Sequence, residues 1–178
     1  MEALLDGGYI AGSLDITTTE LADELVGGVL SAGPQRLEAA GRNHVPQVVS
    51  LGALDMVNFG PFESVPESFR GRNLYRHNAT VTLMRTTAEE CAELGRIIAT
   101  KLNAAESPTA LFIPLKGISM IATQGQTFYD PAADLALITQ LKTHIDAHVQ
   151  VHELDMEIND PRFATAMADT LHAMLQAE

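Results

Sequence analysis

The sequence predicts an α/β fold of three layers, in which a mainly parallel sheet is flanked by helices. Four short and nearly continuous apolar runs recur along the 178 residues, and such runs are typical of strands buried on both faces of a sheet. The segments between these runs carry apolar residues at spacings of three and four, which is the pattern of amphipathic helices. Alternating strands and helices along one chain form a layered domain with parallel strands.

The four apolar runs give the predicted strands, which are residues 9–16, 46–53, 110–117 and 148–155. The predicted helices are residues 19–26, 34–42, 86–103, 131–147 and 161–176. This alternation of strands and helices along the chain is that of a Rossmann- or flavodoxin-like fold. A length of 178 residues with 46% hydrophobic residues suits one core, so we expect residues 1–178 to form a single α/β domain.

Residues that favour helix starts stand where three of these helices should begin. Thr86 or Thr87, followed by two glutamates, resembles a capping box. The pairs Asp130-Pro131 and Asp160-Pro161 each place a capping side chain before a proline at the first helical position. The C-terminal three predicted helices are therefore supported by both periodicity and capping.

Residues 53–85 do not follow the alternation and contain several glycines and prolines. A long excursion of this kind is usually functional or part of an interface, and residues 72–84 could add strands to the sheet. Phe59 and Phe62 flank a non-periodic turn, and exposed large apolar groups often mark contacts. We expect a homodimer or larger homo-oligomer through this segment, or a contact with another part of a longer protein.

The composition excludes several classes of partner and compartment. Eleven basic against twenty-three acidic side chains give 11 − 23 = −12, which disfavours nucleic acid and anionic membranes as partners. The lone Cys91 stands in a predicted helix and has no partner for a disulfide, as is usual in a reducing compartment. No apolar run approaches the length of a membrane span and no signal-peptide pattern is present. We expect a cytoplasmic protein.

Polar clusters follow all four predicted strands. In open parallel sheets, ligands bind at the carboxyl ends of the strands. This rule brings residues 15–20, 52–58, 116–126 and 153–160 to one edge of the sheet, and it predicts a binding site there.

The first cluster, "DITTTE", places Asp15 before Thr17, Thr18, Thr19 and Glu20. One of the threonines could cap the following helix, with the acids favouring the positive end of its dipole. Alternatively, the hydroxyls and backbone N–H groups could hold a phosphate or carboxylate. In that case Asp15 would orient a sugar hydroxyl or bind hydrated Mg²⁺. Three hydroxyls exceed what one cap needs, and the interpretation as an anion site is the one we favour.

The next two clusters also have two interpretations each. Gly52 allows close backbone approach, and Asp55 with Asn58 could serve a ligand or simply stabilise a turn. Lys116 and Gly117 follow a strand, and a lysine there could reach a phosphate. No phosphate-loop sequence with Gly-Lys-Ser/Thr and no Gly-x-Gly-x-x-Gly occurs, so no familiar nucleotide motif supports this assignment.

Histidines offer weaker candidates. His77 stands in "RHNATVTLMR", the densest basic stretch, and could act as an acid or contact an anion, or lie exposed on a strand edge. His144, His148 and His152 keep a spacing of four, which would form a metal stripe only if one helix carried all three. We interpret that spacing as coincidence, because residues 148–155 alternate like a strand.

Four stretches carry a family resemblance: "LDITTTELADELVGGVLSAGP", "VPQVVSLGALDMVNFGP", "HNATVTLMRTT" and "EINDPRFA". They resemble the C-terminal half of a two-domain family, found in bacteria, fungi and plants, that includes the tomato mosaic virus resistance protein. The resemblance covers essentially all 178 residues. It implies an N-terminal half of similar size, Rossmann-like and associated with ATP, which we expect as a partner of this domain.

Two functional hypotheses follow. In the first, the domain is half of a protein that binds a nucleotide such as ATP, or a phosphometabolite, and Thr17 to Glu20, Gly52, Lys116 and Gly117 contribute to a cleft that closes against the other half. In the second, it is an enzyme for a small anionic metabolite, assisted by Mg²⁺. Its metal ligand or base would then be Asp15, Glu20 or Asp55, and its acid His77.

Overall fold

Residues 1–177 are described by a computed structural model, and four parallel strands form its main sheet. The strands are β1 (Ser13–Thr17), β2 (Gln47–Gly52), β6 (Thr109–Pro114) and β7 (Gln150–Leu154). Their order in the sheet is β1-β2-β6-β7, and every neighbouring pair is parallel. The four predicted strands and their parallel pairing are confirmed.

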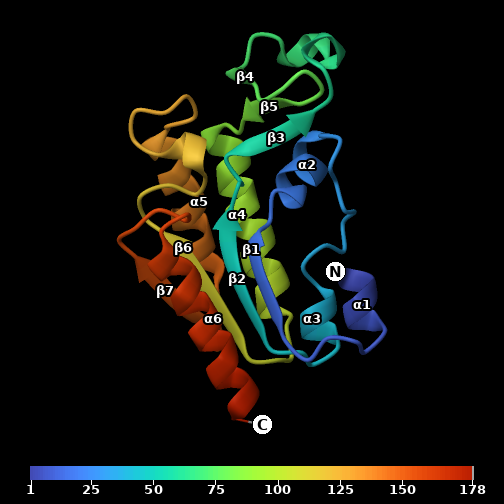
Figure 1. Cartoon of the computed structure of the whole chain (residues 1–178), viewed down its shortest axis with the longest axis vertical. Helices are drawn as coiled ribbons and strands as arrows, with labels where there is room; N and C mark the ends of the chain where they lie inside the picture. Colours follow the sequence, from blue (N-terminus) through green and yellow to red (C-terminus); the bar gives the residue numbers. More distant parts are fainter. Residues whose placement is uncertain (178) are drawn as a thin grey trace.

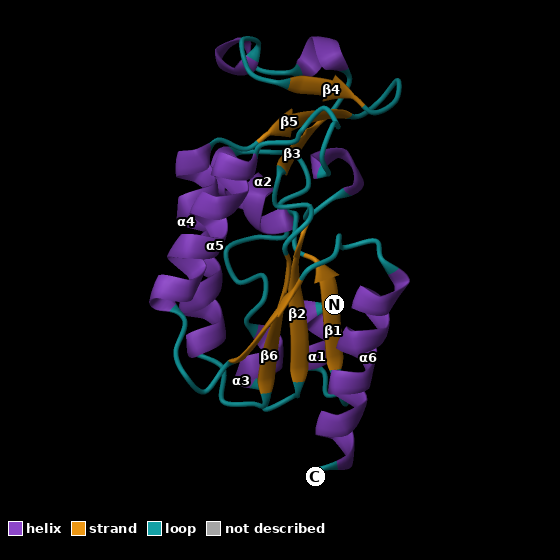
Figure 2. Ribbon diagram, turned by 90° about the vertical axis from the view of Figure 1, so that its left-hand side faces the viewer, coloured by secondary structure: helices purple, strands orange, loops and turns teal. Residues whose placement is uncertain are grey.

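Helices cover both faces of this sheet (Figure 2). One face carries α2 (Glu20–Val26), α4 (Ala88–Asn103) and α5 (Pro131–His144), and the other carries α6 (Pro161–Gln176). Alternate residues of a strand point to opposite faces, so Val48 packs against α6 whereas Val49 and Leu51 pack against α4 and α5. The three-layer α/β fold is therefore confirmed. None of the helices in the described chain is long and apolar enough to cross a membrane.

The predicted helix 34–42 is mostly wrong. Only α3 (Ala39–Arg42) is helical, and it packs with α1 (Glu2–Asp6) in a small separate core. Residues 34–37 form turns, with Leu37 at φ 75°. A positive φ at a leucine interrupts a helix, and the turn carries Arg36 into contact with β1.

Residues 56–85 do not add strands to the main sheet, as the sequence suggested for 72–84, but form a second sheet. It contains β3 (Met56–Phe59), β4 (Leu74–Arg76) and β5 (Thr82–Arg85) in the antiparallel order β3-β5-β4. Short 3-10 turns η1 (Phe62–Ser64) and η2 (Glu67–Phe69) connect β3 to β4. This arm projects beyond the carboxyl ends of β1 and β2 (Figure 1). The chain changes direction after β2 at Ala53, whose φ is 58°.

The helix caps form as expected. Thr87 accepts from the N–H of Glu90, whose side chain in turn accepts from the N–H of Thr87, which completes the capping box. Asp130 and Asp160 cap α5 and α6 through their carboxylates. The helix α5 ends at His144 and His152 lies in β7, so the three spaced histidines share no helix.

Candidate functional site

The loops that follow the four parallel strands form one continuous surface. Beyond the strand ends, the N–H of Ala53 donates to the carbonyl of Ile118 at 2.8 Å, and the N–H of Ile158 donates to the carbonyl of Gly117 at 3.0 Å. The N–H of Thr18 donates to the carbonyl of Gly52 at 3.0 Å. The loops after all four strands therefore lie together at one edge, as the ligand-site rule for parallel sheets predicts.

Two glycines at this edge are required by the backbone. A Cβ at Gly52 would stand 2.3 Å from the carbonyl oxygen of Ile16, so no side chain fits between β1 and β2. Gly117 has φ 140°, a conformation that L side chains rarely adopt. Both residues that the sequence selected thus allow the loops to pack closely, which is a structural role independent of any ligand.

Asp15 lies within an ion-pair network rather than at the open edge. Both of its carboxylate oxygens accept from the guanidinium of Arg36, at 2.6 and 2.7 Å, and both side chains are buried. The Nε of Arg36 lies 3.5 Å from Oε2 of Glu20, and Glu2 completes the network at 3.2 Å. The assignment of Asp15 and Glu20 to metal or ligand binding stays a prediction, and this network is the competing structural role.

The three threonines point to different surroundings. Thr18 is fully buried and its hydroxyl donates to the carbonyl of Ser50 at 3.1 Å. Thr19 is the first residue before α2, but its hydroxyl donates to the carbonyl of Met56 instead of capping the helix. Thr17 is exposed at the end of β1. Of the three, Thr17 alone lines a hollow of the strand-end edge.

Asp55 is fully buried below this edge. Its Oδ2 accepts from the hydroxyl of Ser119 at 2.7 Å, and its Oδ1 has no hydrogen-bond partner in the described chain. Burial raises the pKa of Asp55 to about 6, although the hydrogen bond from Ser119 and the charge of Arg85 oppose this rise. Asn58, predicted beside Asp55, instead donates its amide to Asp23 at 2.7 Å and joins β3 to α2.

The residues of the basic stretch 76–85 lie in two different parts of the structure. Arg85 is buried and donates to Asp134 on α5 at 2.6 Å and to the carbonyl of Phe128 at 2.8 Å. Arg76 lies on the arm, above the ring of Phe62 at 4.0 Å. His77 is exposed in the turn that follows β4, on the arm and away from the strand-end loops. The structure therefore does not bring His77 together with Asp55 or Lys116.

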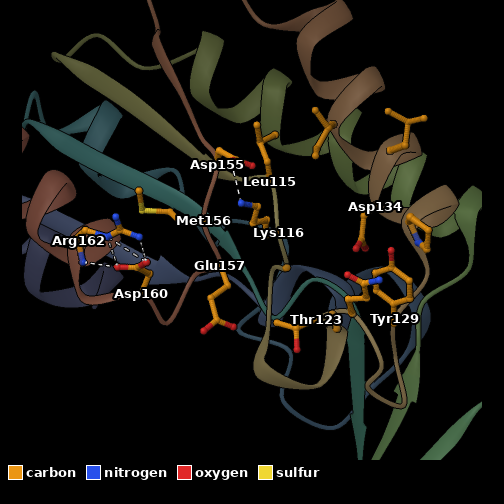
Figure 3. Close-up of a pocket in the computed structure, with 16 residues that line it drawn as sticks. Leu115, Lys116, Thr123, Tyr129, Asp134, Asp155, Met156, Glu157, Asp160 and Arg162 are labelled. Carbon is orange, nitrogen blue, oxygen red and sulfur yellow. Dashed lines mark hydrogen bonds and ion pairs between the residues drawn. The ribbon is translucent and has the colours of Figure 1, made fainter.

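A large hollow of about 730 Å³ opens at the carboxyl ends of β6 and β7, between the first turns of α5 and α6. Figure 3 shows Lys116 pointing to Asp155, which it contacts at 2.8 Å. Arg162 pairs with Asp160 at 2.6 Å on one side of the hollow, and Asp134 lies on the opposite side. The charged lining residues are Lys116, Asp134, Asp155, Glu157, Asp160 and Arg162.

A small hollow of about 160 Å³ lies nearer the centre of the same edge. Thr17, Gly52 and Ser119 line it together with Asn159. The rest of its lining is apolar and consists of Ile16, Ala53, Ile118, Met120 and Ile158. The residues predicted from the sequence are thus divided, with Thr17 and Gly52 at the small hollow and Lys116 and Gly117 at the large one.

The sequence did not select Arg36, Ser119 or Asp134. Their contacts with Asp15, Asp55 and Arg85 join residues 21, 64 and 49 positions apart. No local motif contains both members of these pairs. The only rule that applies is that a buried carboxylate requires a partner, and this rule does not say which residue the partner is.

Comparison with known proteins extends these findings. Residues 1–175 match the model of the C-terminal domain of an uncharacterised protein family, UPF0261. A UPF0261 protein of Clostridium tetani is 58% identical over 99% of this chain, and the match covers 44% of that protein. A UPF0261 protein of Rhizobium meliloti is 51% identical over 93% of this chain, which corresponds to 42% of the relative.

A plant relative is also similar. The ToMV resistance protein Tm-1(GCR237) of Solanum lycopersicum is 44% identical over 96% of this chain and 23% of its own length. The chain thus spans less than half the length of these relatives. The resemblance expected from the sequence is confirmed at the level of the family, and the chain belongs to UPF0261, as its C-terminal domain.

Proposed function

We propose that this domain forms one wall of a cleft that binds a nucleotide such as ATP, or a phosphometabolite, together with Mg²⁺. The observation that carries the proposal is the hollow of about 730 Å³ at the carboxyl ends of β6 and β7, with Lys116 at its strand end. Its position follows the rule for ligand sites in parallel sheets, and its size is that of small-molecule sites.

Lys116 is available to a phosphate. Its ion pair with Asp155 is solvent-exposed, with 59% and 78% of the two side chains accessible. Exposed pairs of this kind contribute only about 0–1 kcal/mol, so a phosphate can replace Asp155 as the partner of Lys116. A charge-assisted hydrogen bond to a phosphate is stronger than one between neutral groups.

The charge of the lining favours a phosphate that carries a cation. Four acids and two bases face the hollow, so a free anion would meet net repulsion. In residues 1–177 no group of three or more acids, histidines or cysteines is placed to hold a metal alone. Mg²⁺ is commonly held by one or two carboxylates together with substrate phosphates and water. Asp155 and Glu157 would supply such carboxylates to an ion that arrives with the nucleotide.

The relatives suggest what closes the cleft. They are more than twice as long as this chain, so each contains a further portion. Exposed apolar side chains stand at the large hollow, and a wall of this kind is suited to contact with another domain. These side chains are Leu115, Tyr129 and Leu135. The other half of the family protein is the proposed partner.

Isothermal titration calorimetry with ATP tests this function, with and without Mg²⁺, on the chain and on the full-length Clostridium tetani relative. We expect binding that requires Mg²⁺ and is tighter in the longer protein. Lys116→Ala should weaken it by about tenfold or more, the value of one hydrogen bond to a charged group.

Lys142→Ala is the matched control, because Lys142 also forms a half-exposed ion pair but does not line the hollow. Absence of binding in both proteins, or equal weakening by the two lysine variants, would refute the proposal.

A further inference from the structure

Asp55 and Ser119 place a carboxylate behind a hydroxyl at the small hollow. Ser119 lines the hollow, whereas Asp55 is fully buried and does not. A compound in the hollow therefore lies against Ser119, and the carboxylate of Asp55 stands 2.7 Å from the hydroxyl of that residue. We infer that Ser119 is a nucleophile, with Asp55 as its general base, that acts on a small uncharged acyl compound such as an ester or thioester.

The contact has the geometry of an activated nucleophile. A serine and its base are expected within about 2.6–3.2 Å of one another, and the hydroxyl of Ser119 donates to Oδ2 of Asp55 at 2.7 Å. The same hydroxyl oxygen accepts from the N–H of Ala122 at 3.2 Å, which leaves its proton for Asp55. The carbonyl of Asp55 accepts from the N–H of Thr86 at 3.1 Å, so the backbone of the base is also held.

The second oxygen of Asp55 distinguishes it from a structural carboxylate. Asp23 is equally buried, and both of its oxygens accept hydrogen bonds: Oδ1 from the N–H of Asn58 and Oδ2 from the Asn58 amide. Oδ1 of Asp55 has no such partner in the described chain. Buried polar groups are nearly always paired, so an unpaired carboxylate oxygen calls for an explanation. A carboxylate that lacks hydrogen bonds on one oxygen is less stabilised as an anion than a fully paired one, so Asp55 takes up a proton on Oδ2 more readily.

The surroundings of Asp55 suit it to proton transfer near neutral pH. Burial raises its pKa to about 6, the hydrogen bond from Ser119 and the charge of Arg85 lower it, and the charge of Asp134 raises it. At pH 7 the carboxylate is thus mostly ionised, yet it binds a proton more readily than an ordinary aspartate. General bases are most effective when their pKa lies near the working pH.

The lining of the small hollow defines the class of substrate. Three isoleucines, Ile16, Ile118 and Ile158, form much of it, and no charged side chain contributes. Thr17 and Asn159 supply a hydroxyl and an amide that can donate to a carbonyl oxygen. A volume of about 160 Å³ admits only a small molecule. An uncharged compound with a short apolar acyl group matches these features.

The reaction is a hydrolysis in two steps. Oγ of Ser119 forms a bond to the carbonyl carbon while its proton passes to Oδ2 of Asp55. The alcohol or thiol then leaves with that proton, and the acyl group stays on Ser119. Water next attacks the acyl carbon and gives a proton to Asp55, and the carboxylic acid leaves as Ser119 recovers its proton from Asp55. This activity is independent of nucleotide binding at the large hollow.

Labelling with a small alkyl fluorophosphonate tests the pair, because this reagent transfers its phosphonyl group to a nucleophilic serine with loss of fluoride. The site of the adduct is located by peptide mass spectrometry. We expect one adduct, at Ser119, that is absent in Ser119→Ala and unchanged in Ser64→Ala, which removes an exposed serine of the arm. Asp55→Asn should slow labelling by about 100-fold or more, the usual contribution of a general base.

The pH dependence separates a base from a structural residue. In the unmodified protein, the labelling rate should rise to a plateau as the pH passes through about 6, since only the carboxylate accepts a proton. This step should disappear in Asp55→Asn, whose folding is checked by circular dichroism. If that variant does not fold, the profile of the unmodified protein decides alone. No adduct at Ser119, a rate that Asp55→Asn leaves unchanged, or a flat profile would overturn the inference.

Discussion

Arg36 binds both carboxylate oxygens of Asp15, with its Nη1 2.6 Å from Oδ2 and its Nη2 2.7 Å from Oδ1. Only 7% and 8% of the two side chains are accessible. The pair connects the turn before α3 to the middle of β1, in a position where neither charge can be solvated by water. A buried charge without its partner is strongly unfavourable.

We therefore predict that Arg36→Ala lowers the free energy of unfolding by about 3–5 kcal/mol. Urea denaturation followed by circular dichroism measures this value. The control is Arg42→Ala, because Arg42 pairs with Asp6 where both side chains are about half exposed, and its loss should be below about 1 kcal/mol. Equal losses in the two variants would show that the Asp15 pair does not behave as a buried one.

Substitution by alanine should lower the stability of the protein at Thr18 but leave it nearly unchanged at Thr17. Thr18→Ala leaves the carbonyl of Ser50 without its hydroxyl donor inside the protein, so the free energy of unfolding should fall by about 1–3 kcal/mol. Thr17→Ala should change stability by less than about 0.5 kcal/mol, since Thr17 is exposed. If Thr17 contributes to a phosphate site, the same variant should weaken phosphate binding by about 1 kcal/mol or more. Thermal denaturation and calorimetry with inorganic phosphate measure the two effects.

Asp55 should make stability depend on pH in the direction opposite to most acids. Its pKa in the folded protein is about 6, above the ordinary 3.8, so the folded state binds its proton more tightly than the unfolded state. This stabilisation is fully present below about pH 4 and is lost as the pH rises through about 6. Compared with Asp55→Asn, the unmodified protein should lose on the order of 3 kcal/mol over that window. Urea titrations of both proteins at several pH values give the difference, and a constant difference would contradict the prediction.

Cys91 should be unreactive in the folded protein. It is fully buried, and burial raises the pKa of its thiol, although the hydrogen bond with Thr86 and the charge of Arg85 lower it. Iodoacetamide at about pH 8 should therefore leave Cys91 unmodified until urea unfolds the chain, because the thiolate is the reacting form. Mass spectrometry of the intact protein records the modification. Rapid labelling of the native protein would place Cys91 in an accessible site.

Self-association stays a prediction, and the structure changes the residues that would carry it. Phe59 is buried against Phe69, so the expectation that it is exposed is wrong. Three of the exposed apolar groups, Leu115, Tyr129 and Leu135, lie together at the large hollow. We expect a dimer by light scattering at micromolar concentration, and Leu135→Glu should weaken it if this surface is the contact. Phe62→Glu tests the arm in the same way, and a monomer in the unmodified protein would exclude self-association at that concentration.

The sequence alone determined the layers of the fold and the edge where its loops gather. The apolar runs from 46–53 and 110–117 predict buried parallel strands because strands covered on both faces must be apolar throughout. The caps at Thr87, Asp130 and Asp160 are local, so a few neighbouring residues suffice to predict them. The family was likewise identifiable from the four quoted stretches.

Only the tertiary structure decided what each polar residue contacts. "DITTTE" reads as one cluster along the chain, yet in the structure Asp15 binds Arg36, Thr18 binds the backbone of β2, and Thr17 faces a hollow. The register of β1 against β2 shifts between Asp15 and Thr17, and Thr18 lies beyond the end of β1, so adjacency in sequence does not keep these side chains together. Ser119 and Asp55 show the converse, because the chain returns after 64 positions to place a hydroxyl against a buried carboxylate.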